Sequence, residues 1–412
     1  MKKIISLVLA IMLCMAFTAP AFAIEASGTR ECYSFTFDKD TGTLTVSQPY
    51  VLSTYLMHNF FQDETEIKSV IFNRSVTVIA PHMFDGCTNL TSVTFDYDSG
   101  PHTICEHAFR DTAITSIKLP KSVKYLDPYA FHGCPKLTTV TFAGGSELTT
   151  IGEYAFCDSA ITSIEIPKSV KSIGEYSFGF CYELSTVTFE KDSGLETIGR
   201  RTFRESGITS IEIPKSVRSI GTEAFIFCDE LATVTFEEGS QLETIGNAAF
   251  DTTAITSFTV PASVISIGED AFDGCSKLTT VTFADGSQLT TICNGAFGNS
   301  GITSFTVPGS VTSIGDSAFI DCSKLATVRF LGSPASIDDY AFLRTTATVH
   351  VPEGWTHGTS QFGGTLNYIA ESLTASTLSE GSVWIICAVG AAAVIAVAAL
   401  VIGKKKRVRN EE

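Results

Sequence analysis

The sequence predicts an elongated solenoid of the α/β type, mostly β, built from about twelve similar coils stacked along one axis. Three observations predict it. Cysteines recur every 47 residues without a slip, phenylalanines keep the same step, and each 47-residue unit divides into two similar halves of 23–24 residues. The phased residues are Cys87, Cys134, Cys181, Cys228, Cys275, Cys322, Phe84, Phe131, Phe178, Phe225, Phe272 and Phe319. A period held this strictly indicates one structural unit copied along the chain.

Each half begins with a short stretch in which apolar and polar residues alternate, as in Ile161–Ile166 and Leu184–Phe189. Alternation with period two indicates a strand that has one buried face. In the halves that carry the cysteine, a proline closes this stretch. Proline suits a strand end because it lacks the N–H that a sheet requires. These prolines are Pro120, Pro167, Pro214, Pro261 and Pro308.

The remainder of each half predicts a second strand and a turn. The pattern Ser-Val-x-Ser-Ile-Gly, as at residues 169–174, is too short and too rich in β-branched residues for a stable helix. We therefore expect an extended segment that ends in a glycine turn. The Ala-Phe-x-x-Cys segment that follows, as at residues 224–228, allows at most a single helical or 3₁₀ turn.

One coil cannot bury its apolar side alone, because its inward side chains need neighbours above and below. We therefore expect the phenylalanines of both kinds of half to form one continuous stack. Those of the second kind are Phe109, Phe156, Phe203, Phe250 and Phe297. At a strand spacing of about 4.8 Å, twelve coils predict a rod of roughly 55–60 Å.

These repeats resemble the BspA-type leucine-rich repeat proteins, a family of bacterial and protozoan surface proteins. The shared frame, L-x-x-V/I-x-F/I-P-x-S-V-x-S-I-G-x-x-A-F-x-x-C-x-x-L, is clearest at Ile161–Leu184 and Ile302–Leu325. The resemblance implies a right-handed leucine-rich repeat array with parallel strands along one face. It also implies binding at the cell surface without catalysis or a cofactor. The second kind of half departs from the frame by lacking the proline and the cysteine, which bears on the shape of the coil.

The N-terminal end of the chain is typical of an exported protein. Residues 1–23 combine two lysines, an apolar core and the small-residue end Ala21-Phe22-Ala23, which predicts a signal peptide. Cys14 suggests a lipoprotein instead, but a leucine precedes it where a small residue is needed. We therefore expect the mature chain to begin near Ile24.

Three further segments follow from the limits of the repeat. Residues 24–66 do not fit the frame, and their two alternating stretches predict a β-hairpin that caps the first coil. The solenoid is expected over 67–352. Residues 353–382 predict a C-terminal cap, in which Trp355 and Phe362 cover the last coil, and then a stalk rich in Ser and Thr.

The C-terminal end predicts a membrane anchor. Residues 383–403 form an uncharged run that spans about 30 Å as a helix, the thickness of a bilayer core. The tail 404–412 follows with a cluster of Lys and Arg, which favours the cytoplasmic side. A buried core helix fits a run of this length and flank poorly. The pattern therefore predicts a single-pass cell-membrane protein with an extracellular solenoid and a cytoplasmic C-terminus.

The charge of the chain excludes one class of partner. Its formal net charge is −16, and the segment between the signal peptide and the anchor holds 21 Lys and Arg against 42 Asp and Glu. Affinity for nucleic acid and for anionic lipid rests on Lys and Arg contacts, and an acidic surface of this kind repels both. We expect no nucleic-acid partner.

The cysteines predict free thiols. The phased cysteines lie on alternate coils, about 9–10 Å apart at the expected spacing, whereas a disulfide requires Cα atoms within about 7 Å. They are better suited to fill the core as small apolar side chains. The same spacing also argues against metal ions bound between successive phased cysteines, because their sulfur atoms would lie too far apart to share one ion. His102, Cys105 and His107 lie close together in sequence, but their equivalents in other coils are ordinary turn residues, so we expect no metal site there.

No catalytic motif stands out from the repeat. Only about 75 extracellular residues lie outside the coils, which is too few for an ordinary catalytic domain. Calcium between the acidic turns at Glu237, Glu238 and Asp285 stays an open alternative, although no loop of the EF-hand type is present. The sequence therefore predicts a non-catalytic protein without a cofactor.

The candidate ligand-binding residues are those that point outward from the centre of each first strand. They are Lys118, Thr141, Glu165, Thr188, Glu212, Thr235, Thr259, Thr282, Thr306 and Arg329. Threonine at these positions has two explanations: it suits a pleated, half-exposed surface, or it builds a hydroxyl-rich platform for a ligand. The predicted partner is a host or neighbouring-cell protein or glycan, for an adhesin or receptor. The alternative is a structural envelope protein that associates with itself.

Overall fold

The computed structural model describes residues 27–30, 33–47, 60–96 and 100–371. The predicted signal peptide (1–23), membrane segment (383–403) and basic tail (404–412) lie outside the described residues, as does most of the predicted stalk. In the part of the chain that is described, no helix has the length and hydropathy that a membrane span needs.

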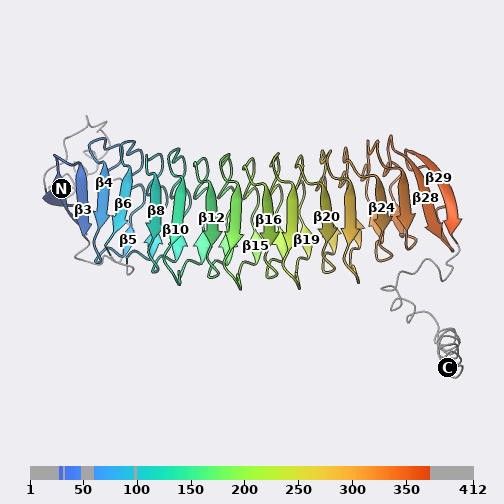
Figure 1. The fold of residues 1–412 in the computed structure, drawn as a ribbon, viewed down its shortest axis with the longest axis horizontal. Coiled ribbons are helices and arrows are strands. Elements are labelled where there is room, and N and C mark those ends of the chain that lie inside the picture. Colours follow the sequence, from blue (N-terminus) through green and yellow to red (C-terminus); the bar gives the residue numbers. More distant parts are fainter. Residues whose placement is uncertain (1–26, 31–32, 48–59, 97–99, 372–412) are drawn as a thin grey trace, which may run out of the picture.

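The described chain is a rod of stacked coils that runs from β3 at one end to β29 at the other (Figure 1). Each regular coil contains one strand of four residues and one of two. The four-residue strands are β4 (Ser69–Phe72), β6 (Ser92–Phe95), β8 (Ser116–Leu119), β10 (Thr139–Phe142), β12 (Ser163–Ile166), β14 (Thr186–Phe189), β16 (Ser210–Ile213), β18 (Thr233–Phe236), β20 (Ser257–Val260), β22 (Thr280–Phe283), β24 (Ser304–Val307) and β26 (Thr327–Phe330).

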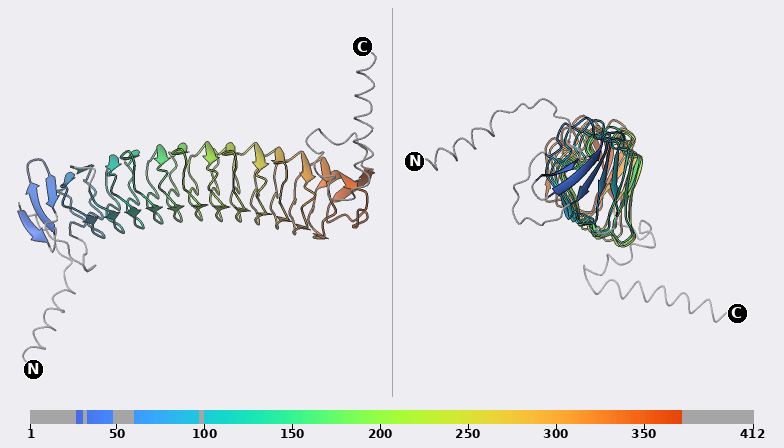
Figure 2. Two further views of the ribbon diagram at one scale, coloured as in Figure 1. Left: turned by 90° about the horizontal axis from the view of Figure 1, so that it is seen from below. Right: turned by 90° about the vertical axis from the view of Figure 1, so that its left-hand side faces the viewer.

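The two-residue strands form a second parallel sheet. They are β5 (Val78–Ile79), β7 (Thr103–Ile104), β9 (Tyr125–Leu126), β11 (Thr150–Ile151), β13 (Ser172–Ile173), β15 (Thr197–Ile198), β17 (Ser219–Ile220), β19 (Thr244–Ile245), β21 (Ser266–Ile267), β23 (Thr291–Ile292), β25 (Ser313–Ile314) and β27 (Ser336–Ile337). All twelve pair in one continuous order. Viewed along the axis, the coils superimpose into one narrow cross-section (Figure 2).

The four-residue strands, called the long strands below, run parallel along one side of the rod. They belong to two hydrogen-bonded sheets, one that ends at β18 and one that begins at β20. Twelve coils contain both kinds of strand, as the sequence predicts. At the C-terminal end β28 (Thr346–Pro352) and β29 (Thr365–Glu371) continue the long-strand column, which brings the described stack to about 14 coils.

Both ends of the described stack have extra strands. At the N-terminal end β1 (Ser27–Arg30), β2 (Tyr33–Asp38) and β3 (Thr43–Ser47) pair antiparallel, and β3 then pairs parallel with β4. The pair β2–β3 is the hairpin that the sequence predicts. At the other end Phe362 is buried, and Trp355 packs on Phe330 with ring centroids 4.8 Å apart.

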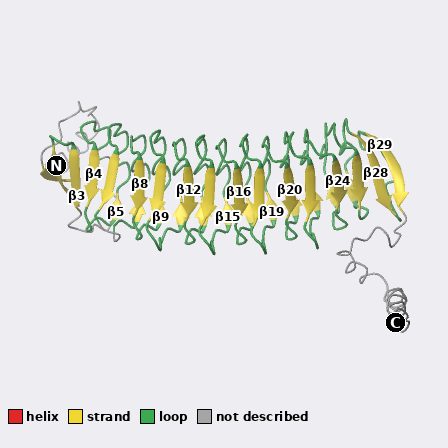
Figure 3. Ribbon diagram, in the orientation of Figure 1, coloured by secondary structure: helices red, strands yellow, loops and turns green. Residues whose placement is uncertain are grey.

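The mostly β solenoid is confirmed, but the α/β label is not, because the described residues contain no helix (Figure 3). The Ala-Phe-x-x-Cys segment forms turns instead. In each Ala-Phe-x-x-Cys segment the residues two places before and two places after the phenylalanine have positive φ, as Glu223 (57°) and Phe227 (59°) do around Phe225. The backbone N–H groups of Glu223, Phe225 and Phe227 donate to carbonyl oxygens of the next coil, at N···O distances of 2.7, 2.8 and 3.0 Å respectively. A helix would need those donors within its own turn.

The core confirms the predicted phenylalanine stack. Thirteen buried rings run through the centre of the described rod, with successive centroids 4.9–5.6 Å apart and interplanar angles of 2–15°. The rings are Phe61, Phe84, Phe109, Phe131, Phe156, Phe178, Phe203, Phe225, Phe250, Phe272, Phe297, Phe319 and Phe342. Burial of each is worth about 1.5–3 kcal/mol relative to exposure, so the stack stabilises every coil against its neighbours.

The six phased cysteines are buried and free, as predicted. They do more than fill space, because each Sγ lies 2.8–3.2 Å from the carbonyl oxygen of the stacked phenylalanine in the preceding coil. In five of them a Thr or Ser hydroxyl also contacts the sulfur at 3.2–3.5 Å. Burial raises the pKa of the Cys134 and Cys228 thiols to about 11, so these side chains stay protonated donors.

Candidate functional site

The candidate site is the outward face of the long strands. In β12, Ile164 and Ile166 are buried while Ser163 and Glu165 are exposed, and the same alternation recurs in the other long strands of the repeat. Because successive side chains of a strand point to opposite faces, stacking the coils places every outward residue in a column along the rod. This face is named the long-strand face below.

Nine of the ten predicted residues are exposed on the long-strand face. Five neighbouring pairs lie directly across from each other in register: Lys118 and Thr141, Glu165 and Thr188, Glu212 and Thr235, Thr259 and Thr282, Thr306 and Arg329. The hydroxyl oxygens of Thr259 and Thr282 are 2.9 Å apart and form a hydrogen bond. The structure therefore brings residues that are 23 positions apart into one exposed column.

Arg329 differs from the other nine. Its side chain is half-buried, and its guanidinium forms an ion pair with Glu371 at 2.7 Å. His350 Nδ1 lies 2.7 Å from the other oxygen of the same carboxylate. Arg329 therefore holds the last strand β29 against the stack, and its contacts are those of the C-terminal cap.

Strand pairing on the long-strand face alternates between complete and incomplete. Within each 47-residue unit the two long strands pair over all four residues, as β12 and β14 do. Between units only the first residues pair, as Thr186 with Ser210, and β18 and β20 form no pair at all. The long strands therefore diverge toward their carboxyl ends at every boundary between units.

The phased prolines explain this divergence. In a complete pair the residue after the strand donates its N–H to the neighbouring strand, as Ala143 does to Leu119 and Glu190 to Ile166, each at 2.9 Å. At each boundary between units the equivalent residue is a proline, for example Pro214, which has no N–H to donate. One ladder hydrogen bond is lost at every second step along the rod.

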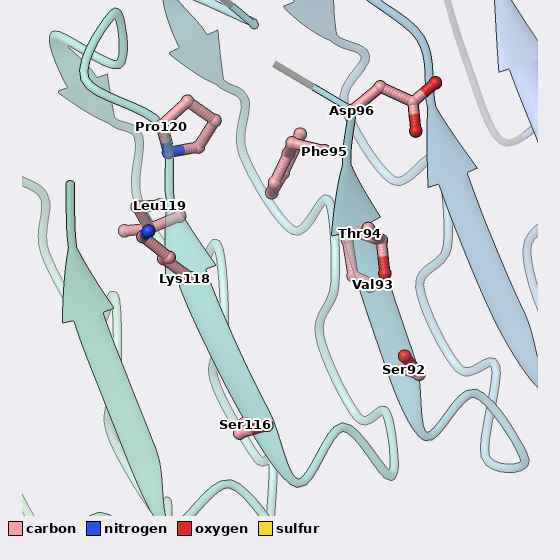
Figure 4. A pocket seen from close by; sticks show the side chains of 9 residues that line it. All are labelled: Ser92, Val93, Thr94, Phe95, Asp96, Ser116, Lys118, Leu119 and Pro120. Atoms are coloured by element: carbon pink, nitrogen blue, oxygen red, sulfur yellow. The ribbon is translucent and has the colours of Figure 1, made fainter. Parts of the chain in front are cut away.

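Hollows open where the strands diverge. One of about 560 Å³ lies between β6 and β8, and one of about 510 Å³ lies between β14 and β16. Phe95 lines the first beside Lys118 and Pro120 (Figure 4). In the second hollow, Phe189, Glu212 and Pro214 are at the equivalent positions, and Thr188 also lines it. The last phenylalanine of each such strand is only partly buried: Phe95, Phe142, Phe189, Phe236 and Phe283.

Sequence reasoning placed Lys118, Thr188 and Glu212 on this face but missed the hollows and the half-buried phenylalanines. The phased prolines indicate where the hollows lie, because each marks a strand end that lacks the N–H which would donate to the neighbouring strand. Each hollow has an aromatic ring in its wall and hydroxyl, ammonium or carboxylate groups at its rim. Such a surface can bind a ligand by apolar contact and hydrogen bonds together.

The other candidate residues do not gather into a site. His102 Nδ1 lies 3.2 Å from the carbonyl oxygen of Ser122, and the His107 ring stacks between those of His82 and Tyr129. Among the residues that the structure describes, no three His, Cys, Asp or Glu side chains are placed to hold a metal ion. Glu237, one of the acidic turn residues, accepts a hydrogen bond from the backbone N–H of Lys215 at 3.0 Å.

A family model matches most of the coils. The model described as BspA type leucine rich repeat region, with 6 copies, matches residues 54–159, 149–263 and 243–357. These overlapping matches together cover well over half of the chain, and they indicate no enzymatic family. No curated protein sequence matches the chain.

The chain is similar to several solved structures. A leucine-rich repeat protein from Bacteroides ovatus is 20% identical, with 84% of this chain and 99% of that one covered and a TM-score of 0.58. One from Eubacterium ventriosum is 21% identical, with 78% and 85% covered and a TM-score of 0.46. The pneumococcal vaccine antigen PcpA is 17% identical, with 85% and 100% covered and a TM-score of 0.43. The likeness to the Bacteroides protein shows a common fold and nothing finer.

Proposed function

Because the chain belongs to the BspA-type leucine-rich repeat family, we propose that it is a non-catalytic cell-surface protein that binds a macromolecular partner along its long-strand face. The partner is a protein or glycan of a host or of a neighbouring cell. The single observation that carries this proposal is the exposed outward column, which runs unbroken past the hollows between β6 and β8 and between β14 and β16.

The arrangement of this face supports many modest contacts with an extended ligand. The hydroxyl groups of Thr188 and Thr235 both donate and accept hydrogen bonds, and the exposed carboxylate of Glu212 lies between them along the column. Solenoids commonly use such long surfaces for binding, because each coil adds a similar small contribution.

We further propose that the protein is exported and anchored, with residues 383–403 as a single membrane span and the solenoid outside the cell. The uncharged run and the basic tail that follows it support this placement. Protease treatment of intact cells tests it: the solenoid is expected to be cleaved from outside while the tail stays protected. Cleavage only after lysis would overturn it.

The binding role is tested with the full chain in neutral detergent on arrays of extracellular proteins and glycans. The test variant is Thr188→Arg with Thr235→Arg, which places two bulky cations on the long-strand face. The matched control is Thr197→Arg with Thr244→Arg, which makes the same change on the short strands β15 and β19 of nearby coils. Loss of binding in the first variant alone supports the proposal. Equal binding by both variants, or no ligand on any array, contradicts it.

Self-association is the second candidate function, and the last strand favours it. β29 pairs with β28 on one side, and its residue Ile369 is an exposed large apolar side chain. An open strand edge with an apolar side chain is a template for pairing with another copy. Sedimentation of the full chain in detergent at increasing concentration, with and without Ile369→Lys, discriminates this candidate from binding to a foreign partner.

A further inference from the structure

Two cysteine-containing halves depart from the repeat frame at the same positions. Just before the phased cysteine, four of the six halves have Gly or Asp, whereas these two have Phe180 and Phe227. Two places after the cysteine, three halves have Lys, whereas these two have Glu183 and Glu230. The repeat frame does not require these residues, and they occur only in these two successive cysteine-containing halves. Their presence therefore indicates a role that is local to this part of the rod.

The backbone at these positions does not favour the aromatic residues. Phe180 and Phe227 have φ of 58° and 59°, in the left-handed region, where the equivalent residues Gly86, Gly133 and Gly274 meet no steric penalty. Bulky side chains are rare in this conformation. They are not placed there to fill the core, since 38% of Phe227 is exposed.

Two of these departures, Phe227 and Glu230, line a hollow at the edge where the long strands begin. It has a volume of about 410 Å³, and both Tyr182 and Phe227 line it. Between them the intervening coil contributes the small residues Ser206 and Gly207. Tyr182 is 62% exposed, so its ring is open to a ligand. Two aromatic side chains that are far apart in the sequence thus line one hollow, with one coil between them.

Carboxylates surround this hollow. Glu205, Asp229 and Glu230 line it. Glu205 is paired with Arg204 at 3.1 Å, but Asp229 and Glu230 form no ion pair with any residue that the structure describes. Aromatic faces beside unpaired carboxylates attract a cation, through the ring quadrupole and through direct charge.

A cation of this chain already lies over two aromatic rings beside the hollow. The guanidinium carbon of Arg204 lies 5.9 Å from the centre of the Phe180 ring and 5.3 Å from that of Phe227. These distances are within the range of about 6 Å over which cations are attracted to aromatic faces. The cluster is therefore chemically competent for a guanidinium or an ammonium group.

We propose that the hollow between Tyr182 and Phe227 binds a lysine or arginine side chain from a basic segment of a partner protein. This inference rests on the proposed binding function and names the chemistry of one contact. The acidic balance of the whole chain, with 44 Asp and Glu against 28 Lys and Arg, adds longer-range attraction for such a partner.

The test uses residues that the chain itself has at equivalent positions, so that the coils should still form. The triple variant is Tyr182→Ser, Phe227→Gly and Glu230→Lys. The control is Tyr340→Ser with Glu353→Lys, which removes an exposed tyrosine and makes the same charge change far from the hollow. The full chain in neutral detergent is titrated with oligolysine and, separately, with fully acetylated oligolysine, and the unfolding midpoint of each variant is measured.

Oligolysine is expected to bind the native chain and the control, and at least about tenfold more weakly to the triple variant, with little binding of the acetylated peptide. Equal affinity in the triple variant and the control, or equal affinity for the acetylated peptide, would overturn the proposal. A neutral glycan that needs Tyr182 while oligolysine does not bind would also overturn it. Loss of array binding in the Thr188→Arg and Thr235→Arg variant concerns the long-strand face, so the two proposals fail separately.

Discussion

The thiol of Cys228 donates a hydrogen bond to the carbonyl oxygen of Phe203 in the preceding coil, with a sulfur–oxygen distance of 3.0 Å. The Ser206 hydroxyl contacts the same sulfur at 3.5 Å. Each phased cysteine thus joins two coils as well as filling the space between them. This relationship makes the thiol a structural donor, for which an apolar side chain is no substitute.

Cys228→Ala is expected to lower the free energy of unfolding by about 1–3 kcal/mol, because it leaves a buried carbonyl without its donor and opens a small cavity. Cys228→Ser keeps a donor and is expected to cost less. Urea unfolding followed by circular dichroism measures both. Thr235→Ala, at an exposed position of the next half, is the control and should change stability by at most about 0.5 kcal/mol. Equal stability of the Ala and Ser variants would contradict a role for the hydrogen bond.

Thiol reactivity follows from burial. Burial raises the pKa of Cys134, Cys181, Cys228, Cys275 and Cys322 to about 11, so that few thiolates exist under mildly alkaline conditions. We expect these five to resist iodoacetamide in the native protein and to react fully in denaturant. Peptide mass spectrometry measures the labelling of each. Cys293, which is half-buried, should be labelled first among the described cysteines. Rapid native labelling of the phased cysteines would show that the coils open readily.

Pro214→Ala tests the origin of the hollows. The new N–H has the position from which Glu190 donates to Ile166 in a complete pair, so β14 and β16 should pair further and the hollow between them should narrow. A new hydrogen bond of about 0.5–1.5 kcal/mol is offset by the greater freedom of the unfolded chain, about 0.4–1 kcal/mol, so net stability should change little.

Hydrogen exchange measures the outcome of Pro214→Ala. The amide that the substitution introduces is expected to be protected to a similar degree as the Glu190 amide, and any ligand that uses the hollow should bind more weakly. Exchange at the rate of an exposed loop would mean that something other than the missing donor separates the strands. Lys191→Ala, also in the lining of this hollow, is the control that leaves the strand pairing unchanged.

Mild acid is expected to destabilise the solenoid through its half-buried histidines. Burial lowers the pKa of His107 and His132 below the ordinary value of about 6.5, and Nδ1 of each ring is buried without a hydrogen-bond partner. The unfolded chain therefore takes up these protons first as the pH falls, and stability decreases below pH ~6.5 until the folded state is protonated as well.

The thermal unfolding midpoint, measured from about pH 7.5 down to about pH 5, checks this expectation. His132→Gln should have a shallower decline than the native chain, because one of the two rings is removed. His102→Gln, which replaces an exposed ring, is the control and should follow the native profile. An identical pH profile for His132→Gln would exclude that ring as a source of the decline.

Features that depend on the period were predictable. The coil length, the strand at Ile161–Ile166, the phenylalanine stack and the free cysteines all follow from residues that recur at fixed steps, because equivalent residues of a stack must lie above one another. The same logic predicts Glu165 and Thr188 side by side on an exposed face, and the two residues lie in register in β12 and β14.

Features that depend on which atoms of neighbouring coils meet were not predictable. The turn around Phe225 looked compatible with a helical turn, yet its donors bond to the next coil. Cys228 looked like an apolar filler, yet its thiol bonds to Phe203.

By itself the sequence determined the repeating unit, the direction of each side chain in the strands and the acidic balance of the surface, since all three are properties of residue order. Tertiary structure alone decided that β14 and β16 pair only at Thr186 and Ser210, and which side chains, such as Tyr182 and Phe227, line one hollow. The physical reason is that hydrogen bonds and cavities form between coils, where contacting atoms belong to residues about 20 or more positions apart.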